Sequence, residues 1–126
     1  MEKLEITICN MHKYSEQEVF DYLVGKIFKQ GERSATSDKG CVYLCEDGKQ
    51  CVAGPLIPSG IYKDNFEGNG WQDLISLDKV PGFHSKLISS LQTVHDTSLK
   101  KEEWKKNYKS IADRHNLKWH YENFNL

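Results

Sequence analysis

The stretch SEQEVFDYLVGKIFKQG, residues 15–31, carries the clearest structural pattern of the chain. It opens with Ser15 and Glu18 at the spacing of a capping box, in which both side chains satisfy backbone amides at a helix start. Gly31 stands where such a helix would end, because glycine adopts the left-handed conformation without a Cβ clash. Between them, apolar residues recur at steps of three and four and form one wide face: Val19, Phe20, Leu23, Val24, Ile27 and Phe28. The stretch predicts a helix at 16–30 that packs this face into the core.

Downstream, GCVYLCEDGKQCVAGPLIP at residues 40–58 places three cysteines around one Asp-Gly turn. We expect strands at 41–45 and 50–54, joined either by a two-residue turn or by a three-residue loop in which Gly48 is the left-handed residue. We favour the three-residue loop, because a type I turn followed by such a glycine accepts an acidic lead-in readily. In that register the side chains of Cys41, Cys45 and Cys51 share one face of the hairpin.

The cysteine spacing fits neither a disulfide nor a zinc site. Cys41 and Cys45 would both be diagonal to Cys51, about 7–8 Å away across the strands and beyond disulfide reach. The chain has no C-x-x-C pair and no histidine at a ligand spacing from one of these cysteines. We therefore expect four reduced thiols, no metal and no cofactor, with the hairpin cysteines acting as small hydrophobic residues.

Strict alternation of apolar and polar residues predicts two further strands, at 3–9 and at 117–121. Three further helices are expected near 71–77, 83–96 and 99–115. The combination predicts an α+β fold, in which a small, mainly antiparallel sheet is covered by three or four helices.

The size and charge of the chain limit its function. A chain of 126 residues is near the usual size of one domain, so we expect a single domain at 1–126. The net charge of −1 argues against a protein that binds nucleic-acid duplexes, which normally shows a basic footprint. No apolar run is long enough to cross a membrane, and the first residues lack the layout of a signal peptide, so we expect a cytoplasmic protein.

Several motifs of the chain belong to one recognisable pattern. The runs QGERS, GCVYLCEDGKQCVAGPLIP, LISSLQTVHD and EEW…IADRHNL resemble a family of small uncharacterised proteins encoded by phages, prophages and other bacterial genomes. The family pattern is QGxRS, CxYRxxDGxxCAxGxLIP, Y, EG, LQxxHD and then a W…HxL helix, and it covers about residues 17–117. Cys45 stands where the pattern has arginine. Residues 1–10 precede the pattern, so they could add an edge strand or a contact between copies of the chain.

Arg33 and Arg114 are the two arginines of the chain, and each could bind a phosphate or carboxylate with its planar fork of donors. Arg33 belongs to a polar stretch with Ser34 and Lys39, a set suited to holding an anion. The alternative for Arg33 is that it closes the preceding helix or pairs with an acid.

The aromatic residues Tyr62, Phe66, Trp71 and Phe83 lie in or near the glycine-rich stretch KDNFEGNGW and could stack a base. Core packing is the favoured alternative for Trp71 and also for Phe83. The predicted ligand-binding residues are Arg33, Ser34, Lys39, Tyr62, Trp71 and Arg114.

A catalytic site is harder to assemble from this sequence. Cys41 or Cys51 together with His95 and Asp96 would supply a nucleophile, a base and an orienting group. However, His95 ends a predicted helix, where a histidine beside the last carbonyls is ordinary, and no known catalytic motif is present. We predict no catalytic residue.

Three functions remain in competition. The favoured one is that of a phage-type accessory protein that counters host antiviral defence, in the host cytoplasm, by stoichiometric binding of a host factor. That factor would be a defence protein or a nucleotide second messenger, and the inhibitor could be a homo-oligomer. The alternatives are a small Cys/His-dependent hydrolase that acts on a phosphorylated signal, and a housekeeping protein-interaction module.

Overall fold

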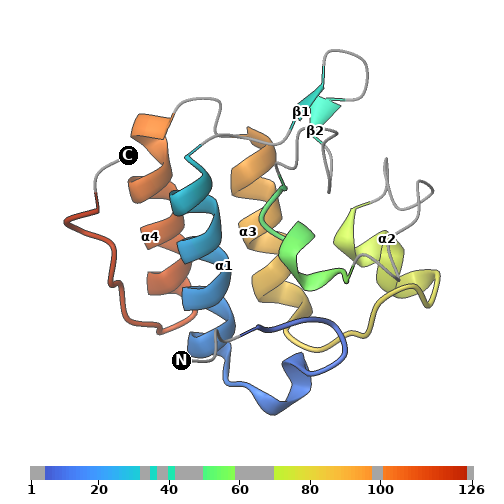
Figure 1. The fold of residues 1–126 in the computed structure, drawn as a ribbon. Coiled ribbons are helices and arrows are strands. Elements are labelled where there is room, and N and C mark those ends of the chain that lie inside the picture. Colours follow the sequence, from blue (N-terminus) through green and yellow to red (C-terminus); the bar gives the residue numbers. More distant parts are fainter. Residues whose placement is uncertain are drawn as a thin grey trace.

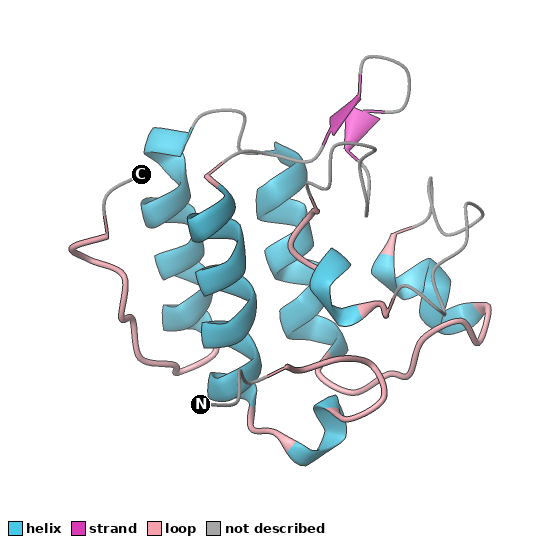
Figure 2. Ribbon diagram, viewed as in Figure 1, coloured by secondary structure: helices cyan, strands magenta, loops and turns pink. Residues whose placement is uncertain are grey.

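The computed structural model describes residues 5–31, 35–36, 40–41, 50–58, 70–97 and 101–124. The α-helices in this part are α1 (Glu16–Gln30), α2 (Trp71–Ser76), α3 (Ser85–Thr97) and α4 (Trp104–Arg114). The 3-10 helices are η1 (Met11–Lys13), η2 (Gly54–Leu56) and η4 (Lys101–Glu103). Two short strands, β1 (Ala35–Thr36) and β2 (Gly40–Cys41), form an antiparallel pair (Figure 2).

The three longer helices α1, α3 and α4 form the body of the molecule (Figure 1). Helix α3 contacts both α4 and α2. Helix α4 runs opposite to α1, since His115, just after α4, lies 3.3 Å from the carboxylate of Glu16 at the start of α1. One hydrophobic cluster joins buried residues of all four α-helices with residues 6–11 and 51–57.

The prediction for α1 is confirmed in detail. The Ser15 amide donates to Glu18 Oε1 at 3.0 Å, and the Glu18 amide donates to Ser15 Oγ at 3.1 Å, so the capping box is complete. Gly31 ends the helix with φ of 71°, and its amide donates to the Ile27 carbonyl. All the apolar residues of the predicted face are buried: Val19, Phe20, Leu23, Val24, Ile27 and Phe28.

The other three helices also form where their apolar spacing predicts them. The apolar face of α4 is buried: Trp104, Tyr108, Ile111 and Ala112. Asn116 follows the end of α4 in the left-handed conformation, with φ of 57°. Phe83, which was expected in the core, precedes α3 and is 52% exposed. Within the part of the chain that the structure describes, no helix is long and apolar enough to span a membrane.

The α+β prediction is wrong. In the described residues the sheet consists of β1 and β2 alone, with Ala35 opposite Cys41. The start of the predicted strand 41–45 pairs with a preceding segment, since Cys41 lies opposite Ala35. Residues 51–53 form a turn that leads into η2, so the second strand of the predicted hairpin is absent there. Cys45 and the turn around Gly48 lie outside the described residues.

The strands predicted at 3–9 and 117–121 are also wrong, within the residues that are described. Ile6 and Ile8 are buried and their neighbours less so, and Trp119 and Tyr121 pack against the core while Lys118 is exposed. The alternation thus indicates which side chains of the two segments face the core, although neither segment is a strand. The covered side of each segment packs against helices, whereas a β-strand must also be hydrogen-bonded to a neighbouring strand. The contact between residues 1–10 and another copy of the chain stays a prediction.

Two glutamine side chains form hydrogen bonds with the backbone of residues 50–53, which follow β2 in the chain. The Gln30 side-chain amide bonds both the amide and the carbonyl of Gln50, each at 2.8 Å. Gln92 of α3 accepts a hydrogen bond from the buried amide of Ala53 at 3.1 Å. These contacts satisfy backbone groups that a sheet would otherwise pair, and they place the Cys51 side chain in the core.

Candidate functional site

Most of the ligand-binding residues predicted from the sequence lie outside the described residues: Arg33, Ser34, Lys39 and Tyr62. Trp71 begins α2 and is 2% exposed, so it packs in the core, which was the favoured alternative for this residue. Arg114 is the last residue of α4 and its side chain is exposed. A ligand could thus reach Arg114 but would find almost no accessible surface on Trp71.

The described members of the possible Cys/His pair are both closed to solvent. Cys51 is 1% exposed and His95 is fully buried, whereas the side chains of Cys41 and Asp96 are not among those described. Cys9 is an exposed thiol and Cys51 is a buried one, and neither forms a disulfide bond. Among the residues described, no cluster of three or more histidine, cysteine, aspartate or glutamate side chains could hold a metal ion.

An open cleft that the sequence did not reveal lies beside α1 and has a volume of about 470 Å³. One wall is a stripe of α1, in which Asp21, Gly25 and Lys29 follow each other at the four-residue spacing of one helix face. The opposite wall belongs to residues 117–124, called here the C-terminal segment. The lining residues are Glu5, Asp21, Tyr22, Gly25, Lys26, Lys29, Tyr121 and Phe124.

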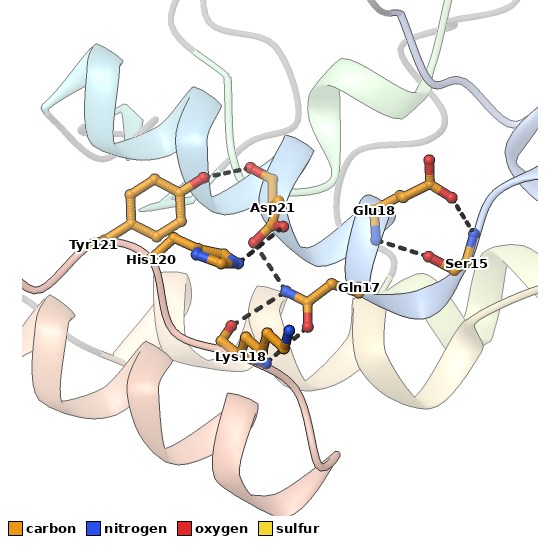
Figure 3. A network of polar contacts seen from close by, with 7 residues as sticks. All are labelled: Ser15, Gln17, Glu18, Asp21, Lys118, His120 and Tyr121. Atoms are coloured by element: carbon orange, nitrogen blue, oxygen red, sulfur yellow. Dashed lines mark hydrogen bonds and ion pairs between the residues drawn. The ribbon is translucent and has the colours of Figure 1, made fainter.

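Hydrogen bonds from the Gln17 side chain attach the start of the C-terminal segment to α1 (Figure 3). Gln17 Oε1 accepts from the Lys118 amide at 2.7 Å, and Gln17 Nε2 donates to the Lys118 carbonyl at 3.2 Å. The same Nε2 also lies 3.1 Å from Asp21 Oδ1. The glutamine therefore pairs with an extended backbone as a neighbouring strand would, although its own backbone is helical.

Tyr121 joins the two walls of the cleft. Its hydroxyl donates to the Asp21 backbone carbonyl at 2.7 Å (Figure 3). A Cβ atom at Gly25 would lie 3.0 Å from this hydroxyl oxygen, which is closer than side chains normally pack. Glycine in a helix interior costs about 1 kcal/mol relative to alanine. The missing side chain at Gly25 is thus explained by the tyrosine that lies over it.

Phe28 of α1 packs against the aromatic side chains of the C-terminal segment. Its ring lies 5.3–6.2 Å, between centroids, from five other aromatic rings: Trp104, Tyr108, Trp119, Tyr121 and Phe124. Four of these pairs are edge-on or tilted, which are favourable aromatic arrangements. The C-terminal segment therefore holds its position through packed rings as well as through hydrogen bonds.

The tyrosines of the cleft are neutral donors near neutral pH. Burial, and then the charge of Asp21, raise the pKa of Tyr121 to about 12. Burial also raises the pKa of Tyr22; a backbone hydrogen bond with Ile6 opposes this shift, and the charge of Glu5 adds to it. Both hydroxyls consequently stay protonated under physiological conditions.

The charges in the cleft are arranged from one end of the α1 stripe to the other. Asp21 Oδ2 lies 3.8 Å from His120 Nε2 of the C-terminal segment, and Oδ1 accepts a hydrogen bond from Gln17 of α1 (Figure 3). Further along α1, the Lys26 ammonium lies 5.4 Å from the centre of the Tyr22 ring. Lys29 follows in the last turn of the helix. Along α1 the lining therefore changes from acidic at Asp21 to basic at Lys26 and Lys29, and the Tyr121 hydroxyl lies over Gly25 between them.

The close approach of Tyr121 to Gly25 predicts strong coupling between these positions. In the Tyr121→Phe background, Gly25→Ala is expected to raise the free energy of unfolding by about 0.5–1 kcal/mol, because only the helix preference remains. In the wild-type background the same change must displace the Tyr121 hydroxyl and lose its hydrogen bond, worth about 0.5–1.5 kcal/mol. There, Gly25→Ala should be neutral or destabilising. Urea denaturation of the four proteins measures the coupling, and additivity within about 0.3 kcal/mol would contradict it.

One sequence signal does point to the cleft. Gly25 interrupts a strong helical pattern, and an isolated glycine at such a place usually has a packing or functional reason. The partner of this glycine lies about a hundred residues away along the chain, so the pattern alone does not identify it. Comparison with family models, curated proteins and solved structures gives no match for this chain.

Proposed function

We propose that this protein works by stoichiometric binding of a host factor and not by turnover of a substrate. In keeping with the phage and prophage proteins that its sequence resembles, it would counter an antiviral defence in the cytoplasm of the host cell. The host factor would be a nucleotide immune signal or a defence protein. Arg33 and Arg114 stay predicted ligands for an anionic group of that factor.

The observation that carries the proposal is the open cleft between α1 and the C-terminal segment. Its volume of about 470 Å³ falls within the range of ordinary ligand sites, which combine apolar walls with a few polar groups. The two walls are held together by packed rings and by the Tyr121 and Gln17 hydrogen bonds. A site that is already formed loses little entropy when its ligand binds.

The chemistry of the cleft favours binding over catalysis. A general base needs a pKa near the working pH, whereas the pKa of Tyr121 is raised to about 12. Cys51 and His95, the described residues that the hydrolase alternative needs, are buried in the core and do not line this cleft. Tyr121 is therefore better suited to holding a ligand than to taking a proton from it.

Infection assays test the proposed role. Bacterial strains that each carry one antiviral defence system are infected with phage in the presence and absence of this protein. We expect the protein to restore phage growth in at least one strain. Replacing Lys26 and Lys29 together by alanine should abolish the effect, whereas the control Lys79→Ala with Lys86→Ala, on exposed residues outside the cleft, should retain it.

A titration in extracts of the rescued strain separates binding from turnover. Inhibition by a binding protein is complete near one equivalent of its target and does not deepen with time. Inhibition far below one equivalent would contradict the stoichiometric mechanism and favour the hydrolase. Failure to rescue any strain would contradict the role in defence and favour the housekeeping module.

A further inference from the structure

We infer that the ligand of the cleft contains a nucleoside phosphate unit, with its phosphate at Lys26 and Lys29 and its base against the aromatic wall. This inference rests on the proposed binding function and specifies the chemistry of the factor that is bound. It is drawn from the order of charged, aromatic and acceptor groups along the cleft.

The basic end of the cleft suits a phosphate. Lys26 and Lys29 are three residues apart on α1, so their side chains are neighbours on the helix surface. Both line the cleft and both are exposed. Two ammonium groups at one end of a partly enclosed site supply the charge-assisted hydrogen bonds that a phosphate needs when it leaves water.

The middle of the cleft suits a planar base. Tyr22, Tyr121 and Phe124 are the aromatic residues of the lining, and stacking of a base on such rings contributes about 1–3 kcal/mol. Gly25 also lines the cleft, and the Tyr121 hydroxyl lies over it, so this tyrosine ring is held close to α1. The ring of Phe124 is held by Phe28, at 5.5 Å between centroids, so this wall is supported from within the core.

The acidic end of the cleft suits the neutral donors of a nucleoside. Carboxylates accept hydrogen bonds from ribose hydroxyls and from the amino groups of bases. Asp21 lies at this end, and Glu5 is the second carboxylate of the lining. From Asp21 to Lys29 is eight residues of helix, or about 12 Å at the α-helical rise, a separation that suits the length of a mononucleotide. A purely anionic ligand would leave the carboxylates repelling it, and a purely apolar one would leave both ends unused.

The test measures binding of AMP, GMP and UMP to the purified protein by isothermal titration calorimetry, with adenosine and inorganic phosphate as partial ligands. We expect at least one mononucleotide to bind at least about tenfold more tightly than either partial ligand, because each of those lacks one of the two contact sets. Lys26→Gln with Lys29→Gln should weaken that binding by at least about tenfold through lost charged hydrogen bonds. The matched control, Lys79→Gln with Lys86→Gln, should change it by no more than about twofold.

The results separate the ligand from the function. If no mononucleotide binds while the Lys26 and Lys29 variant still loses phage rescue, the nucleotide inference is overturned, and a protein target occupies the cleft. If a mononucleotide binds equally well to that variant, the assignment to the cleft is overturned. If a mononucleotide binds there and is converted to product, the ligand class stands and the proposed stoichiometric function fails.

Discussion

Phe28→Ala is expected to lower the free energy of unfolding by about 3–5 kcal/mol, the usual cost of removing a buried aromatic ring. The ring is buried, and five other aromatic rings surround it within 6.2 Å. Each favourable ring pair contributes about 0.5–1.5 kcal/mol beyond the area it buries. The substitution removes these pairs together and leaves a cavity between α1, α4 and the C-terminal segment.

Denaturant titration measures the loss, and Phe28→Leu is the matched control. Leucine keeps most of the apolar volume but none of the ring contacts, so it should cost clearly less than alanine. Amide hydrogen exchange should also show faster exchange at Lys118, whose amide bonds Gln17, because the segment loses its aromatic support. A total loss below about 1 kcal/mol for Phe28→Ala would mean that the ring cluster contributes little to stability.

Leu23→Ala is expected to cost about 2–5 kcal/mol. Leu23 is fully buried in the middle of the α1 face that joins the central cluster. Alanine at this place removes apolar contacts and leaves a void that packed helices close only in part. The helix itself should persist, because alanine favours helix and the capping box at its start is untouched.

The control for Leu23→Ala is Lys106→Ala, on the exposed side of α4. An exposed substitution of this kind changes stability by about 0.5 kcal/mol or less. A change of that small size at Leu23 would show that the apolar face of α1 does not pack into the core in solution. Circular dichroism of both variants should keep the helical signal at low denaturant.

Helix α1 is the element that the sequence by itself determined. The capping box joins residues three apart, Gly31 bonds Ile27 four residues back, and the apolar spacing of three and four repeats through the helix. All of these interactions act within about one helical turn. These interactions therefore do not depend on which distant residues lie nearby.

The sheet and the cleft were decided by the tertiary structure. The alternation at 117–121 correctly indicated an extended segment with one buried side, but its neighbour could be a strand or a helix. Gln17 bonds Lys118, and Tyr121 bonds Asp21, across about a hundred residues of chain. Nothing local to either residue indicates its partner.

The same reason explains why the glycine was visible in the sequence and the site was not. Gly25 breaks the helical pattern because the Tyr121 hydroxyl needs the space where a Cβ atom would lie. The residues next to Gly25 in the sequence do not indicate that this tyrosine is its partner. Periodicity and capping depend on residues a few positions apart, so the sequence determined the helices. The pairing of extended segments and the shape of a cleft depend on which surfaces meet when the chain folds. Only the tertiary structure determines which surfaces these are.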